Sequence, residues 1–143
     1  EWVWALAYQS VLESEQERTA ARLLEFERDY IAYMLDKLAY FEQQSIALLG
    51  YALPQIWLLH ANALNAAAYA DLVAATRERG YRTITLDEAL ADPAYAHADG
   101  YRGRYGPSWL HRWAMAEKRP REFYGDEPTV PRRILDLAGV DSE

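Results

Sequence analysis

Residues 54–65 read Pro-Gln-Ile-Trp-Leu-Leu-His-Ala-Asn-Ala-Leu-Asn, and this stretch decides how the rest of the chain is interpreted. It lies between two helical patterns. Residues 55–59 have the length and the bounding proline of a buried strand, although periodicity alone does not separate such a run from a buried helix segment. We predict a strand that ends at His60. Period-2 geometry then puts Ile56, Leu58 and His60 on one face and the intervening residues on the other.

The segment after His60 predicts a βαβ unit. Asn62 or Asn65 can cap a helix that ends at Gly80, and residues 81–85 alternate in the manner of a second short strand. Such an order gives parallel strands joined by a right-handed crossover. Two strands are few for a parallel sheet, whose faces must both be covered. The chain is therefore either a helical protein with a two-stranded ribbon or part of a larger barrel.

A very long helix is predicted over residues 15–49. Ser14 and Glu17 fit a capping box at its start, and neither Pro nor Gly interrupts it. Apolar residues recur in steps of three and four from Leu24 to Leu48. At 1.5 Å per residue the helix is about 50 Å long, which is unusual for one small domain. A coiled coil is the alternative, but about three heptads with many aromatic residues favour packing on a sheet or on helices.

Four shorter helices are predicted from periodicity and cap residues. The first covers residues 2–13, with Trp2 and Leu6, and also Val3 and Ala7, four residues apart on its apolar face. The others cover residues 86–91 behind a capping box of Thr85 and Glu88, 108–116 behind Ser108, and 131–138 between Pro131 and Gly139.

Composition limits the classes of function. The 143 residues suit one domain, and 51% apolar residues can build a sizeable core. The net charge of -7 argues against a nucleic-acid partner, because neutralising phosphates needs clustered Lys and Arg. The sequence has no cysteine, which excludes disulfides and thiolate zinc sites. Since no apolar run approaches the about 18 residues of a membrane span, we expect no membrane partner.

The order of short motifs along the chain resembles the last part of a polysaccharide deacetylase, a family also called NodB-like or carbohydrate esterase family 4. The resemblance covers nearly the whole chain but only the C-terminal half of the family's domain. It rests on Leu58-Leu59-His60 with Asn62 and Asn65, Gly80-Tyr81-Arg82, and Leu86-Asp87-Glu88-Ala89-Leu90, and on Phe41-Glu42-Gln43-Gln44-Ser45 upstream and Ser108-Trp109-Leu110-His111-Arg112-Trp113 downstream.

The resemblance implies a fold and an activity. The fold would be α/β and helix-rich: residues 1–143 would be the C-terminal portion of a single domain, a distorted (β/α) barrel with one very long helix and a βαβ unit. The activity would be removal of acetyl groups from N-acetylated carbohydrate, outside the cytoplasm or at the cell envelope. A divalent metal such as zinc, held by one aspartate and two histidines, would activate water, and a second aspartate would act as base.

Those metal-binding segments precede the position at which this chain starts, so the resemblance implies metal ligands outside it. We expect the isolated chain to be inactive. The N-terminal half would be a second chain or a part cut away, or a homo-oligomer would cover the open face. A second hypothesis, from another class, is a non-catalytic helical interaction or self-assembly domain whose stripe from Leu24 to Leu48 pairs between chains.

His60 is the candidate catalytic residue. It matches the histidine of the family's Leu-x-His motif, which by the resemblance protonates the leaving amine, and an imidazole exchanges protons readily near neutral pH. Leu58 and Asn62 are expected to contact the substrate. Glu1-Trp2 resembles the end of an Asp-x-x-Asp-Trp motif of the family, with Glu for the last acid and the first acid missing. The alternative is a strand-end histidine satisfied by a backbone carbonyl.

The other two histidines do not predict a metal site. His97 falls in a predicted loop and His111 within a helix flanked by tryptophans. No pair of histidines has the spacing that puts two ligands on one helical face. We therefore expect His111 to pack against its neighbours or to make a local hydrogen bond.

Overall fold

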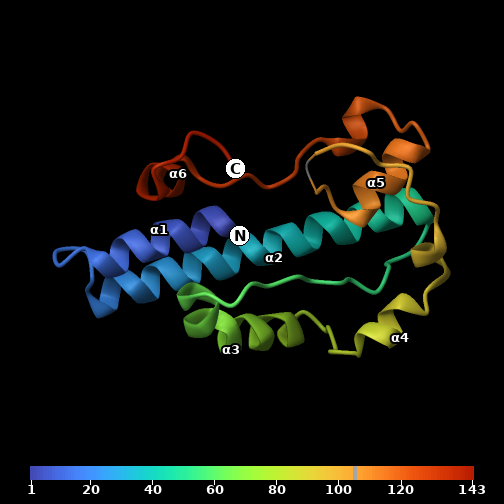
Figure 1. Ribbon diagram of the computed structural model, residues 1–143. Helices are drawn as coiled ribbons and strands as arrows, with labels where there is room; N and C mark the ends of the chain where they lie inside the picture. The colour runs from blue at the N-terminus through green and yellow to red at the C-terminus, as the bar shows by residue number, and fades with distance from the viewer. Residues whose placement is uncertain (105) are drawn as a thin grey trace. The chain divides into compact units, whose positions relative to one another are not determined.

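A computed structural model describes residues 1–104 and 106–143, and it is built from helices (Figure 1). The α-helices are α1 (Trp2–Glu13), α2 (Ala20–Leu49), α3 (Ala63–Glu78), α4 (Leu86–Leu90), α5 (Trp109–Ala116) and α6 (Arg132–Ala138), and 3₁₀ turns cover Pro93–Ala96 and Arg121–Tyr124. The chain divides into two compact units. The first unit comprises Glu1–Asp36, Leu58–Arg82 and Pro128–Glu143, and the second comprises Lys37–Trp57 and Thr83–Glu127.

The predicted α/β barrel with its βαβ unit is wrong. Within the described residues the structure has no strand and no sheet, and the segments 55–59 and 81–85 carry no regular secondary structure. Figure 1 draws the first of them as an open trace without a paired neighbour. The burial along it nevertheless alternates as predicted: Ile56, Leu58 and His60 are exposed, whereas the residues between them are half-buried. Alternation specifies two faces, but a strand also needs a hydrogen-bonded neighbour.

The core of the first unit forms around α1. This helix contacts α3 and α6, and its Trp4 ring meets α2, with centroids 5.4 Å from Phe26 and 5.4 Å from Tyr33. Val3, Trp4 and Ala7 are buried, while Trp2 and Leu6 are exposed. Of the four residues expected on the apolar face of residues 2–13, Val3 and Ala7 therefore lie in the core, and Trp2 and Leu6 do not. Trp4 is the largest fully buried side chain here, and truncating such a residue to alanine costs about 3–5 kcal/mol.

The long helix begins later than predicted. Thr19 accepts a hydrogen bond from the Arg22 amide at 3.2 Å, as an N-cap does, and α2 starts at the next residue. Ser14 accepts a hydrogen bond from the Glu17 amide at 3.2 Å, but residues 15–17 form a turn and not the start of the long helix. The first part of α2 belongs to the first unit and the rest to the second. Each unit therefore buries apolar residues from its own part of α2.

The other helix ends follow the predicted chemistry. Asn62 caps α3 by accepting from the Asn65 amide at 2.8 Å, and Gly80 follows that helix with φ +87°, a conformation that favours glycine. Thr85 and Glu88 form the complete capping box of α4. Ser108 caps α5, and Gly139 ends α6 in the left-handed region. Pro131 precedes α6 rather than being its first residue.

The core of the second unit joins α2 to α5 through apolar residues. A buried serine in α2 secures the chain that follows: Ser45 Oγ donates to the Glu42 carbonyl at 2.8 Å and accepts from the Leu53 amide at 3.2 Å. A buried polar group that is bonded on both sides avoids the desolvation cost of an unpaired one. The buried members of this core are Leu48, Leu53, Ala94, Leu110, Trp113 and Ala114.

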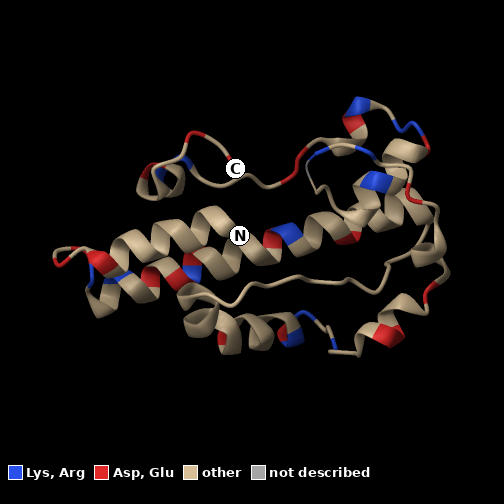
Figure 2. Cartoon of the chain, in the orientation of Figure 1, with Lys and Arg blue, Asp and Glu red and all other residues tan. Residues whose placement is uncertain are grey.

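Charged residues of both signs are interleaved along the chain, as on α2 in Figure 2. Opposite charges pair locally, for example Arg22 with Glu25 at 3.0 Å and Lys37 with Glu127 at 2.7 Å. An exposed pair such as Arg22–Glu25 contributes less than about 1 kcal/mol, whereas the Lys37–Glu127 pair is half-buried. None of the described helices is both long enough and apolar enough to cross a membrane.

Candidate active site

His60 is held by its backbone while its ring remains exposed. It lies in the first unit, two residues before the N-cap of α3. Its amide donates to Glu1 Oε1 at 3.2 Å, and its carbonyl accepts from Asn65 Nδ2 at 2.7 Å. The side chain is 68% exposed. The main chain is thus fixed at both polar atoms, and the imidazole can meet another molecule.

The carboxylate of Glu1 binds Nδ1 of the His60 imidazole. Glu1, the residue that precedes α1, places Oε2 2.8 Å from His60 Nδ1, and its own side chain is only 13% exposed. Burial by itself raises the pKa of Glu1, but hydrogen bonds from His60 and Asn65 outweigh it and hold that pKa below its usual value. Glu1 is therefore ionised at neutral pH.

The ionised carboxylate fixes the tautomer of the ring. A carboxylate only accepts hydrogen bonds, so Nδ1 of His60 must carry the proton between them. Nε2 has no hydrogen-bond partner in the part of the chain that the structure describes. The pair consequently presents Nε2 outward, as the nitrogen that can accept or release a proton.

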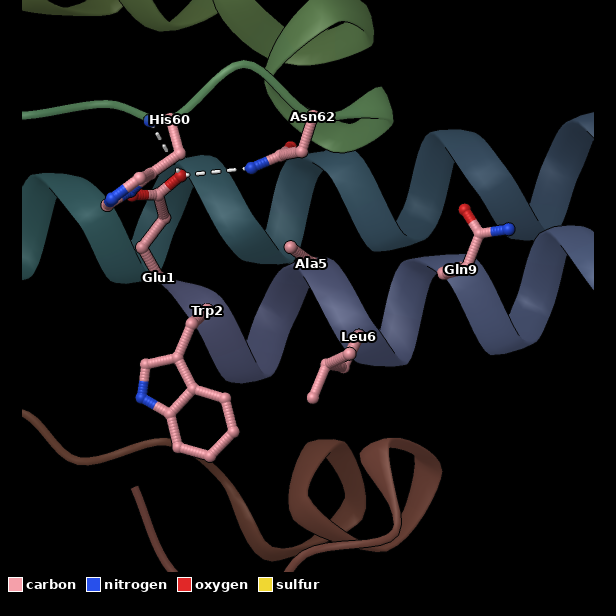
Figure 3. A pocket seen from close by; sticks show the side chains of 7 residues that line it. All are labelled: Glu1, Trp2, Ala5, Leu6, Gln9, His60 and Asn62. Atoms are coloured by element: carbon pink, nitrogen blue, oxygen red, sulfur yellow. Dashed lines mark hydrogen bonds and ion pairs between the residues drawn. The ribbon is translucent and has the colours of Figure 1, made fainter.

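An open pocket of about 440 Å³ lies beside this pair (Figure 3). One wall is the face of α1 that the core leaves uncovered, where Trp2 and Leu6 are its apolar lining residues. In Figure 3 these two side chains point away from the His60–Glu1 pair. His60 and the Glu1 carboxylate form its polar end. The lining residues are Glu1, Trp2, Ala5, Leu6, Gln9, His60 and Asn62.

The predicted site residues are only partly brought together. His60 and Asn62 both line the pocket, and Asn62 Nδ2 donates to Glu1 Oε1 at 3.1 Å. Leu58 is 74% exposed and is not among the lining residues. Contact of Leu58 and Asn62 with a substrate stays a prediction.

Sequence reasoning missed two members of this cluster. Glu1 was singled out only as an imperfect match to a motif, and Asn65 only as a possible cap. Asn65 Nδ2 lies 2.5 Å from Glu1 Oε1, and its Oδ1 accepts from the buried Tyr30 hydroxyl at 2.7 Å. The spacing of Asn62 and Asn65 was a signal, because one asparagine suffices to cap a helix and the second needs another reason.

The remaining histidines serve local structure in the second unit. His111 is buried, and its Nε2 lies 3.1 Å from the Tyr40 hydroxyl, as the sequence led us to expect. Burial lowers the pKa of His111; Glu127 acts in the opposite direction and Lys37 in the same one. His97 lies with Nδ1 2.8 Å from the carbonyl of Ala94.

A metal ion does not fit the described residues of this chain. Over residues 1–104 and 106–143, no group of three His, Asp or Glu side chains could hold one. Glu1 and His60 by themselves offer two ligand atoms that already bind each other, whereas a catalytic zinc takes three protein ligands.

In comparisons with known proteins, no protein-family model, no curated protein and no solved structure matches the chain.

Proposed function

We propose that this chain supplies the general acid, His60, to an enzyme that hydrolyses acetamido groups of N-acetylated carbohydrate. The observation that carries the proposal is the Glu1–His60 pair, in which a half-buried carboxylate binds Nδ1 at 2.8 Å and the ring stays exposed at the pocket. A general acid needs a fixed ring, a free nitrogen and access to the substrate. The resemblance of the Leu-x-His segment to polysaccharide deacetylases supports the same role.

The proton transfer follows from this geometry. In the protonated imidazolium, Nδ1–H bonds Glu1 Oε2 and Nε2–H points to the substrate nitrogen. Water adds to the acetyl carbon, the carbon–nitrogen bond breaks, and the Nε2 proton moves to the departing nitrogen, which leaves as an amine with acetate as the other product. The carboxylate stabilises the imidazolium before transfer and holds the neutral ring afterwards. The resemblance places the base and the metal that activate the water outside this chain.

The pocket is suited to a sugar ring. Pyranose rings have apolar faces that stack on aromatic side chains, and ligand sites combine such walls with a few placed polar groups. Here the exposed Trp2 ring supplies the wall and the His60 imidazole the polar group. An acetamido group at the polar end would then meet Nε2.

The test is acetate release from an N-acetylglucosamine oligomer by the complete enzyme of which this chain would be part. His60→Ala should lower turnover about 10²–10⁴-fold, the usual contribution of a general acid. His97→Ala is the matched control, since it removes an exposed histidine from the second unit, and it should stay within about twofold. Equal losses in both variants, or none in His60→Ala, would reject the proposal.

No particular observation favours the alternative of a self-assembly domain. That hypothesis needs the stripe from Leu24 to Leu48 at the surface, but Met34, Leu38 and Leu48 are buried within their own units. Leu24 is exposed, as single surface leucines often are. The native mass of the purified protein tests the alternative: a mass of two or more chains would support the self-assembly hypothesis.

A further inference from the structure

We propose that Asn65 and Tyr30 are positioning residues for His60, acting through the Glu1 carboxylate. The inference rests on the proposed function, because it assigns a role in that site to two buried residues that do not line the pocket. It goes beyond the Glu1–His60 pair itself. Its basis is a chain of hydrogen bonds from the interior of the first unit to the imidazole.

The two oxygens of Glu1 have different partners. Oε1 accepts from the His60 amide, from Asn62 Nδ2 and from Asn65 Nδ2, at 3.2, 3.1 and 2.5 Å. Oε2 lies 2.8 Å from His60 Nδ1. Three N–H groups thus hold one oxygen and leave the other directed at the ring. A carboxylate without those donors could rotate, and Nδ1 would lose its fixed acceptor.

Asn65 connects both parts of the pair. One N–H of its amide group donates to Glu1 Oε1, and Asn65 Nδ2 also donates to the His60 carbonyl at 2.7 Å. Both of these partners are acceptors only, so the amide nitrogen must face them and Oδ1 must face Tyr30. The hydrogen-bond partners therefore fix which end of the Asn65 side-chain amide is the nitrogen and which is the oxygen. Asn62, by contrast, donates to the Glu1 carboxylate, whereas the donor to the His60 carbonyl is Asn65.

Tyr30 secures that orientation from within the core. Its hydroxyl donates to Asn65 Oδ1 at 2.7 Å, and both side chains are buried. Burial and the nearby Glu1 charge raise the pKa of Tyr30, so the hydroxyl keeps the proton that it donates. Such buried, fully bonded networks specify one arrangement of their members. A flipped Asn65 amide would set its oxygen against the carboxylate of Glu1, which is repulsive.

The test reads the ring directly, by the ¹⁵N shifts of the His60 imidazole in the chain at about pH 8.5, where an imidazole is neutral. Wild type should be mainly the Nδ1–H tautomer. Asn65→Ala should lower the ratio of Nδ1–H to Nε2–H tautomer about tenfold, since the bond at stake is charge-assisted. Tyr30→Phe should lower it about threefold, because it acts one bond further away.

A matched control separates positioning from mere stability. Leu72→Ala removes a buried side chain of the first unit two turns further along α3, and should destabilise the unit at least as much as Asn65→Ala. The tautomer ratio should stay at its wild-type value in Leu72→Ala. A ratio that falls equally in the control, or stays unchanged in Asn65→Ala, would overturn the inference.

Failure of this positioning inference can be told apart from failure of the proposed function. If the ratio falls in Asn65→Ala but acetate release by the complete enzyme is indifferent to His60→Ala, the positioning stands and the deacetylase proposal fails. If His60→Ala abolishes acetate release while Asn65→Ala leaves the tautomer ratio unchanged, the positioning inference alone fails.

Discussion

The two units of this chain use a histidine in opposite ways. In the first unit, His60 has an exposed ring, and its bonding partner is the carboxylate of Glu1. In the second, His111 is buried among aromatic rings, with Phe41 and Tyr124 at centroid distances of 5.3 and 5.4 Å. The His60 ring is open to solvent. Protonation of the other is opposed by its surroundings.

The difference shows how environment, rather than residue type, assigns a role. A carboxylate partner stabilises the imidazolium form, which a general acid requires. A buried site with a phenol partner favours the neutral ring: burial and two acidic neighbours raise the pKa of Tyr40 to about 12, so its hydroxyl remains a donor to His111 Nε2. We therefore assign chemistry to His60 and structure to His111.

The largest expected effect on stability separates the two rings. His111→Ala removes a buried ring and should lower the free energy of unfolding of the second unit by about 3 kcal/mol. His60→Ala removes an exposed ring and should cost less than about 1 kcal/mol. Chemical denaturation of both variants measures the contrast, and similar losses would show that His60 is as structural as His111.

Acidification should weaken the second unit first. The pKa of His111 is lowered in the folded state, so its contribution to stability is present above the unfolded value of 6.5 and is lost as pH falls through the folded value. The free energy of unfolding should therefore decrease as pH falls below 6.5. His111→Gln cannot titrate and should flatten this part of the curve, and an unchanged slope would contradict the assignment.

The first unit should respond at lower pH. The folded-state pKa of Glu1 is lowered, so the stability it contributes is present above the unfolded value of 4.5 and is lost as pH falls below it. Native-state hydrogen exchange of the α3 amides should report a loss that Glu1→Gln abolishes. If these amides instead lost protection together with those of α5 as pH fell below 6.5, the separation of the two units would be incorrect.

The smallest expected effect concerns the phenol partner of His111. Tyr40→Phe removes one hydrogen bond and keeps the ring that packs 5.9 Å from His111 and 5.1 Å from Phe41. The cost should be about 1 kcal/mol. Thermal unfolding of Tyr40→Phe measures it. A loss as large as that of His111→Ala would mean that the hydroxyl, and not the buried ring, stabilises this region.

Local signals in the sequence predicted most helices because caps and stops are local chemistry. Asn62, Thr85 and Ser108 each cap a helix as expected, and Gly80 follows one in the left-handed region. The start of α2 was wrong because two cap candidates, Ser14 and Thr19, compete within five residues. Propensity does not decide between them, whereas packing does.

The strands failed for a different reason. Alternation around Leu58 correctly predicted which side chains share a face, but hydrogen-bonded partners are non-local and the sequence window cannot supply them. His60 and Asn62 were singled out from the sequence, and both line the pocket. The hydrogen bonds of Asn65 were not predicted, because its partners Glu1 and Tyr30 lie 64 and 35 residues away along the chain.

The most direct test of the account compares two leaving groups in the complete enzyme. Departure of an amine from an N-acetylated sugar needs a proton, whereas p-nitrophenolate leaves p-nitrophenyl acetate without one. His60→Ala should lower hydrolysis of the amide about 10²–10⁴-fold and that of the activated ester by less than about threefold. Equal losses with both substrates would contradict the assignment of His60 as the general acid.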